Sequence, residues 1–103
     1  MVEFRKALAD DLVFDTLGES VGFFRFGGQG AEAIARACAC YEREGLVDAP
    51  HEEALRDVLL RQPGWFGFED ISGLPWLEID FVEDIAQAHA QILPAIRTEF
   101  PDY

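Results

Sequence analysis

The sequence predicts a mixed α/β fold in which a layer of about three strands is flanked by helices. Three short runs rich in aromatic and β-branched residues are bounded by glycine, serine or proline, which is typical of buried strands. They are SVGFFRF (20–26), WFGFEDI (65–71) and PWLEIDF (75–81). Around them, apolar residues recur at the three- and four-residue spacing of amphipathic helices. The predicted element order is therefore α-β-α-α-β-β-α, a layered arrangement.

Two helices are predicted in the first half of the chain. Phe4, Ala7 and Leu8 recur at helical spacing, so we expect a short amphipathic helix over residues 2–11. After the first strand, AEAIARACACYEREG predicts a second helix, and Gly45 lies where a left-handed C-terminal cap belongs.

Two more helices are predicted further along. DAPHEEALRDVLLRQPG has Asp48 as its candidate N-cap and Pro63 as its stop. Ser72-Gly73 then predicts a tight connection between the second and third strands. The last helix should start near Val82, and Pro94 should kink or end it.

Length and charge limit the protein class. A chain of 103 residues accommodates one domain, spanning 1–103, and its half-hydrophobic composition with nine Phe predicts a folded protein. Eight Lys and Arg against twenty Asp and Glu give a net charge of −12. No basic stripe can form for a phosphate backbone, so nucleic acid is excluded as a partner. An acidic surface suits metal ions or cationic groups.

The location of the protein is predicted from its cysteines and its apolar runs. Cys38 and Cys40 are the only cysteines, and two residues apart on a helix they point in roughly opposite directions, which excludes a local disulfide. Free thiols indicate a reducing cytoplasm. No run approaches the ~20 apolar residues of a membrane span, and the charged N-terminus is unlike a signal peptide.

Some familiar motifs have simpler explanations. Gly28-x-Gly30-x-x-Ala33 matches the dinucleotide-binding pattern, but three strands cannot supply two mononucleotide-binding halves, so we interpret it as a glycine turn. His89 falls on the apolar stripe of the last helix and is predicted to be a core or interface residue, and His51 lies at a helix start.

The stretch GLPWLEIDFVEDIAQA encloses carboxylates between apolar residues. In a strand, Trp76, Glu78 and Asp80 share one face, and two carboxylates at a strand end can hold a hard divalent cation. The alternative is that Asp80-x-x-Glu83 forms a capping box, with Asp80 accepting from the first N–H groups of the helix. Both interpretations stay open from the sequence. The capping interpretation leaves Glu78 without a role.

This stretch resembles a known family. PWLEIDFVEDIAQAHAQILPAI is similar to the C-terminal end of the GT-A-like nucleotidyltransferases that activate sugar phosphates and phosphocholine. GESVGFFRF, DAPHEEALRDVLL and FGFEDISGLPW resemble the corresponding segments of its phosphocholine cytidylyltransferase-like members, so the similarity covers roughly residues 18–97. It implies a partial Rossmann-like layer of the GT-A type.

The resemblance also implies roles for particular residues. Asp80 would be one of two ligands of a catalytic Mg²⁺, and Glu53 and Glu78 would line the pocket of the phosphate-bearing substrate. Trp76 would offer an aromatic face to a quaternary ammonium group. The partners implied are a nucleotide and a phospho-alcohol or sugar phosphate.

The chain departs from the family at its N-terminal half. Nothing corresponds to the glycine-rich loop that holds the triphosphate, or to the second metal-binding Asp, and phosphoryl transfer depends on such positioning. The sequence thus predicts the acceptor-side portion of a nucleotidyltransferase, transferring a nucleotidyl group such as CMP and inactive alone. The alternative is a non-catalytic acidic α/β module for interaction or oligomerisation. Without the N-terminal half of the family fold, an unpaired sheet edge and an apolar face predict a homo-oligomer.

Overall fold

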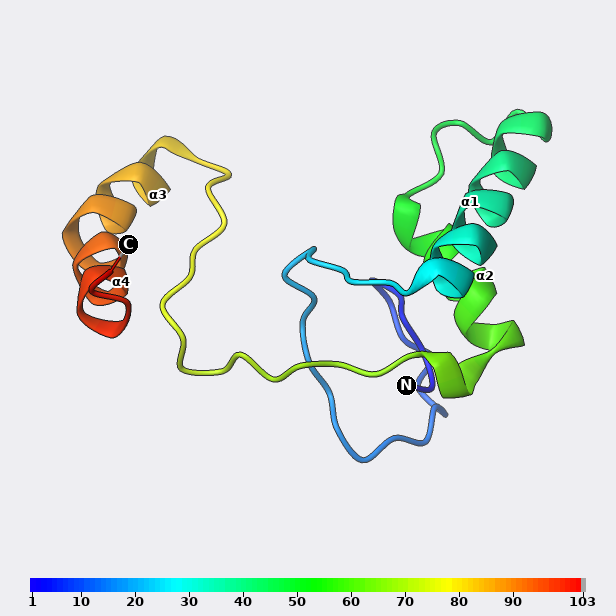
Figure 1. The fold of residues 1–103 in the computed structure, drawn as a ribbon, viewed down its shortest axis with the longest axis horizontal. Coiled ribbons are helices and arrows are strands. Elements are labelled where there is room, and N and C mark those ends of the chain that lie inside the picture. The colour runs from blue at the N-terminus through cyan, green and yellow to red at the C-terminus, as the bar shows by residue number, and fades with distance from the viewer. Residues whose placement is uncertain (103) are drawn as a thin grey trace. The chain divides into compact units, whose positions relative to one another are not determined.

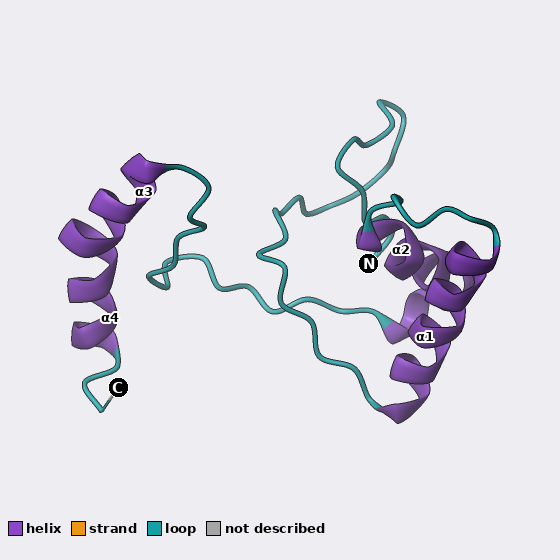
Figure 2. Ribbon diagram, turned by 90° about the horizontal axis from the view of Figure 1, so that it is seen from above, coloured by secondary structure: helices purple, strands orange, loops and turns teal. Residues whose placement is uncertain are grey.

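Helices joined by irregular chain make up the protein, as a computed structural model that describes residues 1–102 shows (Figure 1). Within those residues there is no strand (Figure 2). The predicted α/β fold class, with its partial Rossmann-like layer, is therefore wrong. The chain divides into two compact units, Met1–Phe68 and the residues from Glu69 onward.

The N-terminal unit is built on a hairpin of two helices, α1 (Gly28–Arg43) and α2 (His51–Arg61), which lie side by side (Figure 1). Small and aliphatic side chains from the facing sides form its core, because apolar residues at helical spacing can be removed from water only against another apolar surface. The buried residues are Ala37, Ala54, Leu55, Val58 and Leu59.

The predicted end of the second expected helix is confirmed. Gly45 has a φ of 72°, its N–H donates to the Glu42 carbonyl at 3.1 Å, and the Leu46 N–H donates to the Tyr41 carbonyl at 2.9 Å. These two bonds form a Schellman motif, which satisfies carbonyls left over at a helix end. Glycine fits because a left-handed φ costs it little. The hairpin connection therefore begins at a position that the sequence specifies locally.

The ends of α2 follow the sequence in part. Pro50 precedes the helix with an extended ψ of 143° and no side-chain cap, so Asp48 is not the N-cap that its position predicted. Acids in the first turn instead complement the helix dipole. The helix ends at Arg61, and Pro63 begins a 3₁₀ turn, η1 (Pro63–Trp65), which confirms its predicted role as a stop.

The three predicted strands are irregular chain in the structure. A strand needs a neighbouring strand for its N–H and C=O groups, and no pairing forms between the described residues. The aromatic residues of the first run instead form a chain of rings. Phe24 lies edge-on to Phe4 at 5.8 Å and stacks on Phe26 at 6.2 Å, and Phe26 meets Phe66 at 6.3 Å.

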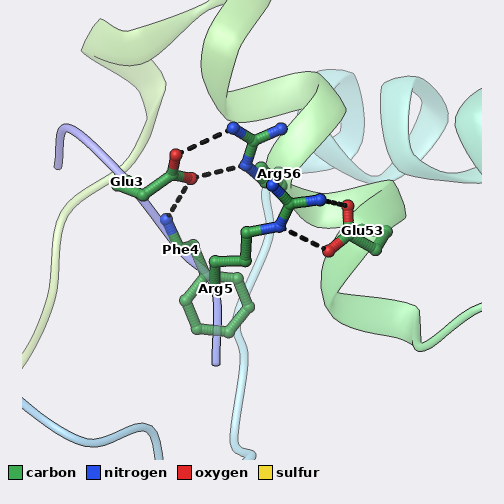
Figure 3. Close-up of polar contacts among 5 residues, drawn as sticks. All are labelled: Glu3, Phe4, Arg5, Glu53 and Arg56. Carbon is green, nitrogen blue, oxygen red and sulfur yellow. Dashed lines mark hydrogen bonds and ion pairs between the residues drawn. The ribbon is translucent and has the colours of Figure 1, made fainter. Parts of the chain in front are cut away.

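The helix predicted over residues 2–11 is also absent, since that segment is irregular. An isolated helix of ten residues is marginal in water. In irregular, extended chain, residues two apart point to the same side. Glu3 and Arg5 use this spacing to reach two side chains of α2 (Figure 3). Tertiary ion pairs therefore outweigh the local helical pattern.

The C-terminal unit consists of an irregular segment followed by one helical stretch. The predicted turn at Ser72-Gly73 is confirmed: Gly73 has a φ of 88°, and the Leu74 N–H donates to the Ile71 carbonyl at 3.0 Å. Helix α3 (Val82–Gln87) starts at the predicted residue and continues through the π-helical η2 (Ala88–Ile92) into α4 (Leu93–Glu99).

Pro94 does not end this helical stretch. It lies in the first turn of α4, directly after the wider turns of η2. Proline lacks an N–H and clashes with the carbonyl four residues earlier in an α-helix, and π-type turns are a common local adjustment to such a disruption. Among residues 1–102, no helix has both the length and the apolar character that crossing a bilayer requires.

Candidate functional site

Three of the predicted site residues lie in the irregular segment before α3. Glu78 and Asp80 are exposed, and Trp76 is 43% exposed. The strand on which their common face was predicted is absent. The fourth, Glu53, lies on α2 in the N-terminal unit. The structure therefore does not assemble these four side chains into one pocket within either unit.

The carboxylate of Asp84, rather than that of Asp80, accepts backbone N–H groups at the start of α3. One oxygen of its carboxylate, Oδ2, accepts the backbone N–H of Phe81 at 2.8 Å and that of Asp80 at 3.0 Å. Phe81 occupies the N-cap position and has no side-chain acceptor, so only the backward half of a capping box forms. The predicted capping box of Asp80 and Glu83 is therefore wrong. The acid whose carboxylate accepts the backbone N–H groups before the helix is Asp84, one residue after Glu83.

A divalent-cation site finds little support around Asp80. Across residues 1–102, no group of three or more His, Cys, Asp or Glu side chains is arranged to hold a metal ion. Mg²⁺ takes octahedral coordination and binds through carboxylates together with substrate phosphates and water. Glu78 and Asp80 alone, both exposed, do not fit such a site, so Mg²⁺ binding stays a prediction from the resemblance.

Glu53 is occupied by an ion pair. Arg5 donates from Nε to Glu53 Oε1 at 3.0 Å and from Nη2 to Oε2 at 3.2 Å (Figure 3). This fork-to-fork geometry uses both carboxylate oxygens. The predicted role of Glu53 in lining a substrate pocket would require this pair to open.

A second bidentate pair lies beside the first. Arg56 donates from Nε to Glu3 Oε1 at 2.6 Å and from Nη2 to Oε2 at 2.8 Å, and Oε1 also accepts the N–H of Phe4 at 2.9 Å (Figure 3). The hydrogen bond from Arg56 lowers the pKa of the Glu3 carboxyl. Together the two pairs fasten the N-terminal segment to α2, which is a structural role.

The two histidines and Tyr41 lie on three different helical elements. His51 lies 3.4 Å from Glu52 and edge-on to the ring of Phe24. His89, predicted to be a core or interface residue, is exposed within its unit. Burial, and then the carboxylate of Asp57, raise the pKa of Tyr41. That hydroxyl therefore stays protonated near neutral pH.

A concave surface with a volume of about 490 Å³ lies between α1, α2 and η1. The buried side chains of Ala37 and Val58 lie beneath it, and the half-exposed ring of Trp65 lies at one side. Its lining also includes three arginines: Arg36, Arg43 and Arg61. We call this surface the arginine groove.

The arginine groove was missed by the sequence analysis, which found no basic patch. Arg36 and Arg43 are seven residues apart, so they share a face of α1, and that spacing is visible in the sequence. Arg61 and Trp65 join them only because α2 folds back along α1. A long-range pairing of two helices is not encoded in any local pattern.

The comparisons with known proteins give no family. No family model, curated protein or solved structure matches the chain. The resemblance to nucleotidyltransferases therefore stays a prediction.

Proposed function

We propose that this chain is a non-catalytic, acidic interaction module that associates with copies of itself. The observation that carries the proposal is the apolar surface of the C-terminal unit. None of the described residues of α3, η2 or α4 is buried. Large side chains just before and within α3 are exposed: Ile79 by 56%, Phe81 by 72% and Val82 by 80%.

Exposed side chains of this kind favour association. Burying a Val, Ile or Phe side chain that was exposed is worth about 1.5–3 kcal/mol, and contiguous apolar surface marks interaction sites. Ile79, Phe81 and Val82 lie within four consecutive positions, so one contact can cover all three. A second protein surface would supply the burial that their own unit does not provide.

The arrangement of polar residues supports a non-catalytic role. Glu53 is paired with Arg5, and among residues 1–102 Glu78 and Asp80 belong to no group of three or more potential metal ligands. Catalysis needs groups held within about 3 Å of a common reacting centre. What the described residues provide instead is a helix hairpin and an exposed apolar segment.

Light scattering and sedimentation velocity over a micromolar concentration range test the proposal. The parent chain should form dimers or larger species, and Phe81→Ser should shift the equilibrium toward monomer by about tenfold, because 1.4 kcal/mol of lost burial corresponds to that factor. Val13→Ser is the matched control, since Val13 is 88% exposed but lies outside the C-terminal unit. A parent that stays monomeric throughout would contradict the proposal.

A further inference from the structure

The arginine groove concentrates positive charge in a strongly acidic chain. It contains three of the eight Lys and Arg side chains, although the net charge is −12. Two of the other cations, Arg5 and Arg56, are already paired with carboxylates. The groove is thus the main place on the N-terminal unit where arginines gather without strong carboxylate partners.

The contacts of the three groove arginines leave their charge available. Arg36 approaches Glu32 only to 3.7 Å, with both side chains 73% exposed, and such surface pairs contribute little. Arg43 donates to the sulfur of Cys40 at 3.0 Å, which does not neutralise it. The Arg61 side chain has no hydrogen bond or ion pair with any described residue. Guanidinium groups above an apolar floor suit a ligand that is both apolar and anionic.

A segment of the same chain has that chemistry. Residues 76–85, WLEIDFVEDI, which we call the acidic segment, alternate apolar side chains with carboxylates. Its exposed apolar side chains are Trp76, Ile79, Phe81, Val82 and Ile85. Its carboxylates are Glu78, Asp80, Glu83 and Asp84. In the described part of the C-terminal unit, Arg97 is the only Lys or Arg, against eight Asp and Glu.

We propose that the acidic segment of one copy binds in the arginine groove of a second copy. This inference rests on the proposed self-association and specifies which two surfaces meet. Opposite charges and apolar side chains are then matched across a single contact. Direct contact between two acidic segments would bring eight carboxylates together, four from each copy, and like charges at close range disfavour a contact.

Such a contact joins two different surfaces, so it is heterologous. Each copy keeps one unused groove and one unused segment, and further copies can add until a ring closes. An isologous contact, in which one surface meets itself, stops at the dimer. The two arrangements therefore respond differently when one surface is damaged.

The test uses two variants that damage one surface each. The groove variant carries Arg36→Glu and Arg61→Glu, both at exposed positions, and the segment variant carries Phe81→Ser and Val82→Ser. Serine at 81 preserves the N-cap, so α3 should still form. The control carries Lys6→Glu and Arg25→Glu, the same change of charge at exposed positions outside the arginine groove.

Sedimentation velocity should show both damaged variants shifted toward monomer by at least tenfold, and the control should match the parent. An equimolar mixture of the two damaged variants should form a one-to-one dimer and nothing larger, because one intact groove and one intact segment remain. Circular dichroism checks that each variant keeps its helices.

Each other outcome has a definite meaning. If the groove variant associates as the parent does, the groove is not the docking site and this inference is overturned, while self-association stands. If both variants are monomeric but their mixture stays monomeric, the contact between groove and segment is likewise excluded. A parent that is monomeric at every concentration overturns both this inference and the proposed function.

Discussion

Asp80 and Asp84 are both acids next to the start of α3, but their surroundings differ. Asp84 accepts two backbone N–H groups, whereas the Asp80 side chain is exposed and accepts no hydrogen bond from the described residues. One of the four N–H groups that a helix start leaves unpaired, that of the N-cap Phe81, and the N–H of the preceding Asp80 therefore depend on a residue in the third helical position. Asp84 stabilises the start of α3 because its carboxylate reaches back to these two N–H groups, which the carboxylate of Asp80 does not.

We expect Asp84→Ala to destabilise the first turn of α3 by about 1 kcal/mol, the usual value of a lost capping interaction. Asp80→Ala should have almost no effect. Backbone ¹³C chemical shifts of residues 81–87 in both variants measure the local helix population. Equal losses in the two variants would mean that both acids stabilise the helix start through their charge alone.

At the level of elements, the N-terminal segment is held on α2 by two arginine–carboxylate pairs with opposite polarity. Glu3 of the segment pairs with Arg56 of the helix, and Arg5 of the segment pairs with Glu53 of the helix. The pair that involves Glu3 is the more protected, with side chains 15% and 21% exposed. Partial burial reduces solvent screening, so this pair should contribute more than an open surface pair.

The Glu3–Arg56 pair predicts a pH dependence. The folded-state pKa of Glu3 lies below its ordinary value, so its contribution is present above about pH 4.3 and is lost as the pH falls through the lower folded pKa. Glu3→Gln should therefore lower the free energy of unfolding by about 1 kcal/mol at neutral pH. In this variant the free energy of unfolding should also decrease less steeply as the pH falls.

Denaturant unfolding between neutral and acidic pH measures this effect. Glu19→Gln is the control, because Glu19 is exposed and its side chain forms no hydrogen bond or ion pair with the described residues. If both substitutions change the decrease of the free energy of unfolding at acidic pH equally, general charge repulsion rather than the ion pair governs acid unfolding.

The elements that were predictable are those with a local cause. Gly45 and Gly73 have a left-handed backbone that glycine adopts easily, and Pro63 follows directly on the end of α2, so these positions were predicted correctly. The run at 20–26 has the composition of a strand, but its rings pack on other rings and no ladder forms. Strand formation depends on a distant partner, which no local pattern supplies.

The same distinction applies to the candidate sites. Alternation predicted a shared face for Glu78 and Asp80, which holds only if their segment is a strand, and it is irregular. Glu53 was placed correctly on a helix, but its partner Arg5 lies 48 residues away along the chain. The arginine groove needed the pairing of α1 with α2. Tertiary contacts therefore decide each site, while the sequence pattern decides only the helices that carry it.

For the whole molecule, the described residues give two small units that are both acidic but share the cations unequally. The described part of the C-terminal unit has eight acids and one Arg, whereas the N-terminal unit has twelve acids and the other seven Lys and Arg. Such an asymmetry favours contacts between unlike surfaces of different copies and disfavours contacts between like ones.

The isolated chain should not release pyrophosphate from any nucleoside triphosphate in the presence of Mg²⁺ and phosphocholine. No group of three or more potential metal ligands is present among residues 1–102, and no segment of the sequence resembles the family's glycine-rich triphosphate loop. A coupled pyrophosphate assay measures this, with Asp80→Asn as the control for contaminating enzyme. Turnover by the parent that Asp80→Asn abolishes would instead support the nucleotidyltransferase resemblance.

The positions of the two tryptophans make this chain its own optical probe. Trp65 borders the arginine groove and Trp76 begins the acidic segment, and they are the only indoles in the sequence. Each is nearly half exposed, at 45% and 43%, so burying either one should shift its emission to shorter wavelength. With Trp65→Phe or Trp76→Phe, the remaining indole reports on one surface alone, and dilution can be followed without attaching a dye.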